Sequence, residues 1–151
     1  MAQRALGLCS PNPMVGAVVV RDGELVGEGY HHQAGCPHAE PLALAKAGER
    51  ARGATLYVTL EPCSTWGRTP PCTDAIIQAG IKRVVVGCVD QNPKHAGIAV
   101  TKLQNAGIEV HCNVLEGPCR RLNEAFFFWV TNQRPFVCLK MAMTLDGRIA
   151  T

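Results

Sequence analysis

The sequence has few charged residues and few aromatic ones, 18% and 5% of its 151 residues. It has no basic stripe, and its formal net charge is only +3, which gives no support for nucleic-acid binding. No apolar run approaches the ~18 residues that a membrane span needs. The opening residues, MAQRALGLCSPNP, lack the apolar segment of a secretory signal. These absences predict a cytoplasmic protein without nucleic-acid or membrane partners, and the mild positive charge suits a small phosphorylated ligand.

Eight cysteines are many for a chain of this length. A secreted disulfide scaffold would account for them, but such scaffolds are usually short and poor in core. Here 47% of the residues are hydrophobic, and several apolar runs are typical of buried strands. Cys88, Cys112 and Cys138 fall inside such runs and are more simply small core residues. We therefore expect one domain with a real core and regard disulfides as the weaker alternative.

The hydrophobic pattern predicts alternating strands and helices. Asp22-Gly23 is a hairpin turn signal between the first two strands, and a helix begins near His38 with Pro41 in its first turn. The predicted strands are 14–20, 25–30, 54–60, 82–90 and 108–114, and the later helices are 72–80, 97–107 and 118–130. The β-α-β-α-β order after residue 54 predicts a three-layer α/β/α domain, whose mixed five-stranded sheet carries an antiparallel edge hairpin.

Three potential metal ligands, one His and two Cys, fall where elements of this fold begin or end. The stretch EPCSTWGRTPPC (61–72) holds Cys63 just past a buried strand and Cys72 at the start of a helix, with a stiff Pro/Gly loop between them. Ligand sites of open α/β sheets form beyond the carboxyl ends of strands, so we expect both thiols there, together with His38. A helix N-terminus lowers the pKa of a thiol, and zinc accepts this ligand mixture.

Glu40 follows His38 by two residues, at the start of the same predicted helix. Both side chains can approach a point above the helix N-terminus, where a metal and a reacting group would lie. Three ligands with a carboxylate that is not a ligand form a catalytic arrangement, because the fourth metal position stays open to water. Two alternatives stay open at this point: a closed structural zinc site with Cys36 as the fourth ligand, or no metal.

The H-x-E motif followed by P-C…C is that of the zinc-dependent base deaminases. The longer C-x8-C spacing, with PNPMVGAVVV (11–20) and VDQNP (89–93), closely resembles the pyrimidine deaminases of riboflavin biosynthesis over nearly the whole chain. The resemblance implies a cytidine deaminase-like fold, one Zn²⁺ per chain on His38, Cys63 and Cys72, and Glu40 as the catalytic residue. It implies hydrolytic deamination of 2,5-diamino-6-ribosylamino-4(3H)-pyrimidinone 5′-phosphate to 5-amino-6-ribosylaminouracil 5′-phosphate and ammonia, by a homo-oligomer.

The same resemblance assigns substrate contacts. Arg68 suits a phosphate or a polar ring edge, because a guanidinium grips oxyanions well. Thr65 stands where members of the family often carry His. Simpler interpretations are that Arg68 is a solvated loop residue and Asn12 a turn residue, and His95 and His111 are interpreted as surface or core residues. The substrate-binding residues that the resemblance implies are Asn12, His31, Thr65, Arg68, Asp90 and Asn92.

Residues 134–151 resemble the opening of the NADPH-dependent reductase domain that follows this deaminase in bifunctional members of the family. The resemblance thus divides the chain into a deaminase domain, 1–133, and the start of a truncated reductase domain, 134–151. Ala142 would bind NADPH only if a full reductase domain follows. Two rival functions remain: a nucleoside, nucleotide or tRNA base deaminase, for which a C-x2-C loop and a strand-binding surface are expected, and a structural zinc scaffold without activity.

Overall fold

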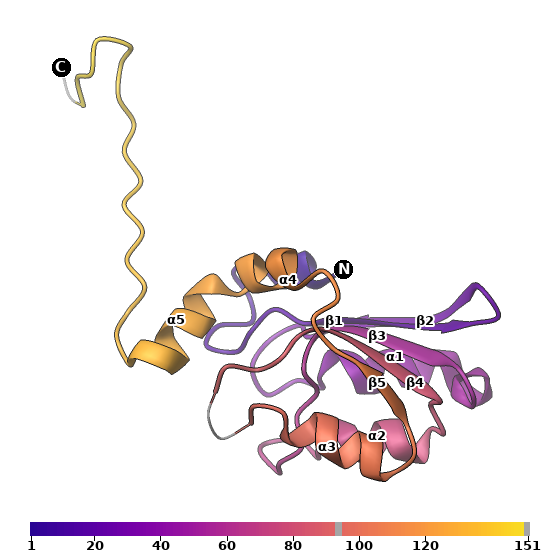
Figure 1. Ribbon diagram of the computed structural model, residues 1–151. Helices are drawn as coiled ribbons and strands as arrows, with labels where there is room; N and C mark the ends of the chain where they lie inside the picture. The colour runs from indigo at the N-terminus through magenta and orange to yellow at the C-terminus, as the bar shows by residue number, and fades with distance from the viewer. Residues whose placement is uncertain (93–94, 150–151) are drawn as a thin grey trace.

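The computed structural model describes residues 1–92 and 95–149 (Figure 1). Pro93, which ends the VDQNP motif, and residues 150–151 of the predicted second unit lie outside the described residues. Within the described ranges one sheet has five strands in the order β2-β1-β3-β4-β5. Their bounds are β1 Gly16–Arg21, β2 Glu24–Tyr30, β3 Thr55–Leu60, β4 Arg83–Cys88 and β5 Glu109–His111.

The strand directions confirm the predicted mixed sheet. β1 pairs antiparallel with both β2 and β3, whereas β3, β4 and β5 run parallel. The hairpin between β1 and β2 turns at Asp22 and Gly23, whose φ angles are 50° and 83°. Two positive φ angles are what a tight two-residue hairpin turn requires, and this explains the Asp-Gly signal. The hairpin places β2 at one edge of the sheet.

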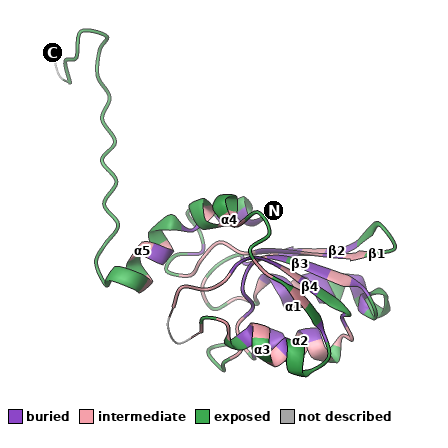
Figure 2. Ribbon diagram, viewed as in Figure 1, coloured by how far each residue is buried: buried purple, intermediate pink, exposed green. Residues whose placement is uncertain are grey.

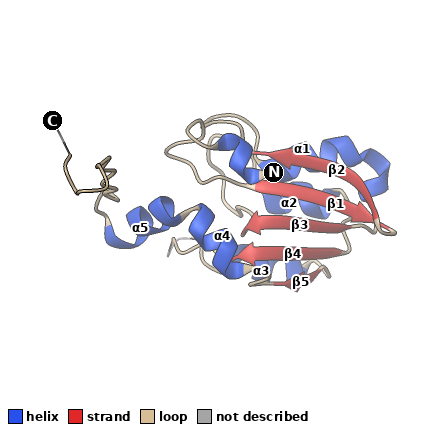
Figure 3. Ribbon diagram, turned by 90° about the horizontal axis from the view of Figure 1, so that it is seen from above, coloured by secondary structure: helices blue, strands red, loops and turns tan. Residues whose placement is uncertain are grey.

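Helices cover both faces of the sheet, as predicted for three layers. In Figure 1, α1, α2 and α3 lie below the sheet and α4 lies above it, and Figure 3 shows α4 crossing its front. α5 follows α4 and extends past the sheet. The bounds are η1 Ala2–Ala5, α1 Ala39–Ala47, η2 Gly48–Ala51, α2 Cys72–Gln78, α3 Ile98–Asn105, α4 Glu116–Leu122 and α5 Glu124–Asn132, with η marking 3₁₀ helices.

The main core lies between the sheet and the layer of α1, α2 and α3. Leu56 and Val84 from the central strands pack there with Ile76 of α2 and Leu103 of α3, all fully buried. The predicted burial of the third strand on both faces is wrong at Tyr57, which is 42% exposed. The opposite face is only partly covered by η1 and α4, so side chains that point to it keep contact with solvent (Figure 2).

A glycine on β2 allows α1 to lie very close to the sheet. A Cβ added to Gly29 would lie 2.5 Å from the carbonyl oxygen of Ala39 and 2.8 Å from the backbone nitrogen of Ala43. Real Cβ atoms do not make such contacts, so a side chain here would push the first turn of α1 outward. That turn carries Glu40 and follows His38 directly, so this close packing fixes two of the predicted site residues.

The single helix predicted over 118–130 is wrong, because the chain breaks between α4 and α5 at Asn123. Asn123 is buried, and its side chain binds the backbone of Met14 twice. The Met14 N–H donates to Asn123 Oδ1 at 2.7 Å, and Asn123 Nδ2 donates to the Met14 carbonyl at 2.9 Å. This pairing satisfies the backbone N–H and C=O of Met14 and fixes the segment that leads into β1.

Residues 134–149 leave the domain as an extended, exposed segment (Figures 1 and 2). Cys138 lies in it and is exposed, so its predicted place in the core is wrong, whereas Cys88 is buried as predicted and Cys112 is half-buried. The eight cysteines are free thiols in this structure. Of the helices in the described residues, none has the length and apolar character needed to cross a membrane.

Candidate active site

Three elements bring His38, Cys63 and Cys72 together. His38 is the N-cap of α1, Cys63 lies in the loop after β3, and Cys72 is the first residue of α2. Nδ1 of His38 lies 3.5 Å from Sγ of Cys63 and 3.3 Å from Sγ of Cys72. The possible ligand atoms of the three residues all lie within 4.8 Å of one another. The two thiols and the imidazole therefore surround one point, as expected for the ligands of a single metal ion.

Cys36 is the residue that a closed four-ligand site would need. In residues 1–92 and 95–149, the groups of three or more His, Cys, Asp and Glu side chains close enough to hold a metal consist of one cluster: His38, Cys63 and Cys72. Cys36 is not part of it and instead lines a neighbouring cavity. A three-residue donor set leaves room for a further ligand from solution, which is the feature that separates catalytic from structural zinc sites.

The thiols are arranged so that one of them ionises readily. A hydrogen bond from the Cys72 thiol, together with the nearby His38 ring, lowers the pKa of Cys63 to about 4. The backbone N–H of Cys72 also donates to Cys63 Sγ, at 3.3 Å. Conversely, the hydrogen bond to Cys63 and burial raise the pKa of Cys72. The hydrogen bond to Cys63 also raises the pKa of His38. Thiolate is the form that binds zinc, so the cluster is prepared for a soft or borderline cation.

Glu40 is a buried carboxyl group in the first turn of α1, 2% exposed. Burial raises its pKa from 4.5 to about 7, outweighing the opposing effect of a backbone hydrogen bond. Among the described residues its Oε2 has no hydrogen-bond partner. An unpaired polar atom in a buried position is costly, and such atoms mark places where a ligand or water completes the structure.

A cavity of ≈290 Å³ opens in front of Glu40. It brings together residues from the segment before β1, the end of β2, the start of α1 and the loops after β3 and β4, which is where the sequence predicted a ligand site. The predicted site residues that line it are Asn12, His31, His38, Glu40, Cys63, Asp90 and Asn92.

His31 and Asn12 form a hydrogen-bonded pair on the wall of this cavity. Nδ1 of His31 donates to the carbonyl oxygen of Pro37 at 3.1 Å, so Nε2 accepts from Nδ2 of Asn12, 2.9 Å away. Burial lowers the pKa of His31, which is 2% exposed, and this favours the neutral ring that the arrangement needs. The pair fixes the orientation of the Asn12 amide, so Asn12 is more than a turn residue.

Thr65 and Arg68 lie in an adjoining cavity of ≈370 Å³. This second cavity shares Asn12, His38, Cys63 and His95 with the first, and the loop between the two cysteines contributes to its lining. The structure thus distributes the six predicted substrate contacts over two neighbouring hollows beside one cluster. Ala142 lies in the exposed segment 134–149 and lines neither cavity.

The sequence interpretation missed several residues that line these cavities. His95, interpreted as a surface or core residue, lines both, and its buried Nδ1 has no partner within the described part of the chain. Glu61 and Phe126 line the first cavity. His95 follows the VDQNP motif by two residues and Glu61 precedes Cys63 by two, so nearness to a motif was the available signal. Phe126 offered no signal beyond its place in an apolar run.

Comparison with known proteins agrees with this geometry. Residues 1–88, more than half of the chain, match the family described as the cytidine and deoxycytidylate deaminase zinc-binding region. The chain belongs to this family of zinc-binding deaminases.

The names of similar proteins are more specific than the description of the family. The riboflavin biosynthesis protein RibD of Aquifex aeolicus is 60% identical over 151 residues, which are 100% of this chain and 42% of that protein. RibD of Escherichia coli is 52% identical over 150 residues, 99% of this chain and 41% of that protein. A diaminohydroxyphosphoribosylaminopyrimidine deaminase/5-amino-6-(5-phosphoribosylamino)uracil reductase from Thermotoga maritima superposes with a TM-score of 0.93 at 54% identity, covering 99% of this chain and 43% of that one.

These comparisons confirm the cytidine deaminase-like fold and the resemblance to the riboflavin-biosynthesis deaminases. The chain spans about two fifths of the length of these relatives.

Proposed function

We propose that this chain catalyses the hydrolytic deamination of 2,5-diamino-6-ribosylamino-4(3H)-pyrimidinone 5′-phosphate. The observation that carries the proposal is one cavity lined by His38 and Cys63 of the His/Cys/Cys cluster and by Glu40, whose buried Oε2 has no partner among the described residues. The name of the Thermotoga maritima relative, at 54% identity, gives the substrate class. The product is 5-amino-6-ribosylaminouracil 5′-phosphate, with ammonia as the leaving group.

The residues present fit one zinc ion per chain. Two thiols and one imidazole are donors that zinc accepts, and the lowered pKa of Cys63 supplies a thiolate. We assign His38, Cys63 and Cys72 as its ligands. A zinc ion in such a site acts as a Lewis acid and lowers the pKa of water toward ~7.

Glu40 is the proton carrier of the proposed reaction. Its raised pKa, about 7, lets the same carboxyl group accept and donate protons near neutral pH. It takes a proton from the water that attacks the ring carbon bearing the amino group. It delivers this proton to the ring nitrogen and then passes the remaining proton of the added hydroxyl group to the amine, so that the carbon–nitrogen bond breaks and ammonia leaves. Water supplies the oxygen of the new carbonyl group, which balances the reaction.

The remaining cavity residues hold the substrate in this proposal. With its Nδ2 engaged by His31, Asn12 offers its Oδ1 to an amino group of the pyrimidine. Asp90 and Asn92 provide further polar groups in the lining of the cavity. Arg68 and Thr65, in the lining of the adjoining cavity, are placed for the ribose phosphate, since a guanidinium binds oxyanions in a planar fork.

Ammonia release from this substrate tests the proposal, with zinc content measured on the same preparation. Glu40→Gln keeps the size of the side chain but cannot transfer the proton, so we expect kcat to fall by about 10²- to 10⁴-fold while one zinc per chain remains. Glu49→Gln makes the same chemical change on an exposed residue just beyond α1 and should behave as wild type. Chelation of zinc should abolish release, and zinc addition should restore it.

Other outcomes would separate the rival functions. Zinc binding without ammonia from any pyrimidine substrate would favour a structural scaffold. Release from deoxycytidylate, cytidine or tRNA but not from the diaminopyrimidinone would show a deaminase with a different substrate. Full activity of Glu40→Gln would remove Glu40 from the mechanism.

We also propose that the domain boundary lies near residue 133, with residues 134–151 forming the start of a second unit that binds NADPH in a longer form of the protein, at Ala142. Its support is the exposure of apolar side chains along the segment, such as Val137 at 84% and Leu139 at 79%, and the greater length of the relatives. The homo-oligomer, the cytoplasmic location and the lack of a nucleic-acid partner stay predictions.

A further inference from the structure

Glu61 is a buried residue at the end of β3, and its carboxylate oxygens accept hydrogen bonds from the backbone of residues 90–99. It is 6% exposed. Its Oε2 accepts from the backbone N–H of Asp90 at 3.1 Å and of Gly97 at 3.0 Å, and its Oε1 accepts from that of Ala99 at 3.1 Å. Three backbone donors on one carboxylate form a strong set, because hydrogen bonds to a charged acceptor are about twice as strong as neutral ones.

These three donors bracket the residues that form one wall of the cavity. Asp90 follows β4, Gly97 is the N-cap of α3, and Ala99 lies in its first turn. Between them lie Asn92 and His95, which line the cavity together with Asp90. Bonds within this wall continue the network, since the Asn92 N–H donates to Asp90 Oδ1 at 2.8 Å and the His95 N–H to the Asn92 carbonyl at 2.8 Å.

The backbone of Glu61 also makes a hydrogen bond, next to the loop that carries Cys63. Its own N–H donates to the carbonyl of Cys88 at 2.9 Å, so the backbone that leads from Leu60 to Cys63 is fixed to the end of β4. Its side chain lines the cavity, yet both carboxylate oxygens are already engaged by backbone donors. A group so occupied cannot also serve the substrate without breaking these bonds, so its contribution is to geometry.

We propose that Glu61 is a positioning residue that sets the distance between the ligand loop and the substrate wall formed by Asp90, Asn92 and His95. This inference rests on the proposed deaminase function and adds to it a residue that determines substrate affinity rather than the chemical step. Glu61 holds both ends of this wall through its hydrogen bonds to the backbone of Asp90 and Gly97. It does so from the end of β3, the strand that leads to Cys63.

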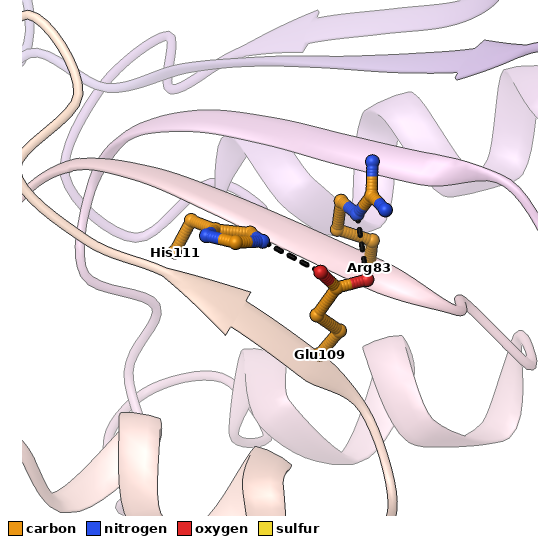
Figure 4. Close-up of polar contacts among 3 residues, drawn as sticks. All are labelled: Arg83, Glu109 and His111. Atoms are coloured by element: carbon orange, nitrogen blue, oxygen red, sulfur yellow. Dashed lines mark hydrogen bonds and ion pairs between the residues drawn. The ribbon is translucent and has the colours of Figure 1, made fainter.

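Glu61→Gln is the most informative variant, because it keeps the shape of the side chain and replaces one acceptor oxygen with an NH₂ donor. The amide has one oxygen, so it either loses the two bonds made at Oε2 or turns its NH₂ toward the N–H of Ala99. Glu109→Gln on β5 is a matched control. Figure 4 shows that the Glu109 carboxylate also uses both oxygens, with Arg83 Nε at 2.8 Å and His111 Nε2 at 2.7 Å, but on the exposed surface. Glu61→Asp retains the charge and withdraws the oxygens by one methylene, which serves if the Gln variant does not fold.

The test is steady-state ammonia release by the zinc-loaded protein, together with backbone and histidine-ring NMR. We expect Glu61→Gln to raise KM for the diaminopyrimidinone ribosyl phosphate by about tenfold, the effect of losing one good substrate contact, with kcat within about twofold of wild type. Glu61→Asp should raise KM by about threefold on the same basis. The Asp90, Gly97 and Ala99 amides and the His95 ring should shift in both Glu61 variants, and one zinc per chain should remain. Glu109→Gln should change none of these.

An unchanged KM in a folded Glu61→Gln protein with lowered thermal stability would overturn the proposal and leave Glu61 a stabilising residue only. Loss of zinc would also overturn it, by showing that Glu61 acts through the ligands. If the wild-type protein releases no ammonia from this substrate, the proposed function fails, and the NMR comparison decides alone: shifts confined to residues next to Glu61, without the His95 ring, would refute the positioning role.

Discussion

The burial of Glu40 predicts how the stability of the metal-free protein depends on pH. Its pKa is raised from 4.5 to about 7, chiefly because burial penalises the charged form. Between these two values the folded state binds more protons than the unfolded state, so the free energy of unfolding falls as pH rises. The stabilising contribution of protonated Glu40 is complete below about pH 4.5, declines through the interval, and is gone above about pH 7.

The magnitude follows from the same two values. At about 1.4 kcal/mol for each pH unit between 4.5 and about 7, the loss is about 3 kcal/mol. Glu40 is fully buried, so screening by solvent does not reduce this figure much. For a domain of ordinary stability, 5–15 kcal/mol, this is a large share.

Urea unfolding of metal-free wild type and Glu40→Gln across pH 4.5 to 8 measures this effect. The titrations of Cys63 and His38 occur in both proteins and cancel to first order in the difference. We expect Glu40→Gln to gain about 3 kcal/mol relative to wild type over the interval, since its amide does not ionise. Glu49→Gln, the exposed control, should give a flat difference. A flat difference for Glu40→Gln would show that Glu40 is already ionised in the folded protein and would refute the desolvation argument.

Two further predictions concern the ends of the domain. Asn123→Ala removes both hydrogen bonds to Met14 and leaves a buried N–H and C=O unpaired, so urea unfolding should show a loss of about 2–3 kcal/mol in the free energy of unfolding. The exposed side chain of Asn132 bonds within α5, so Asn132→Ala should stay within about 0.5 kcal/mol of wild type. Equal effects of the two variants would contradict the role assigned to Asn123. Removal of residues 134–151 should cost less than about 1.5 kcal/mol, because the described part of this segment makes one aromatic ring contact with the domain, between Phe136 and Phe128. Ammonia release should stay intact, and a larger loss of stability would move the domain boundary.

The sequence predicted the sheet and the metal cluster well because both depend on local patterns. Alternation of apolar runs with helix signals defined the order of elements, and Asp22-Gly23 has the φ angles its sequence indicated. The cluster of His38, Cys63 and Cys72 could be foreseen because each residue lies at the start of a helix or just past a strand.

What the sequence could not give depends on contacts between distant residues. The break between α4 and α5 depends on Asn123 binding Met14, 109 residues away, whereas the local pattern from 118 to 130 is continuously helical. The exposure of Tyr57 depends on how much of the sheet α4 covers, which strand composition does not report. Glu61 and His95 are separated by 34 positions, so only the fold reveals that they line one cavity.

The metal-free site contains one feature that costs stability, a buried carboxyl oxygen of Glu40 that has no partner among the described residues. The lowered pKa of Cys63, by contrast, means that the folded state favours its thiolate. A buried oxygen such as that of Glu40 is unfavourable in an empty cavity, and in the proposed function the water or substrate that enters the cavity becomes its partner. Close packing nearby offsets this loss of stability, for example the packing of α1 against Gly29 and of Leu56 in the core. The raised pKa of Glu40, which destabilises the metal-free domain as pH rises toward 7, is also the property that the proposed reaction needs in its proton carrier.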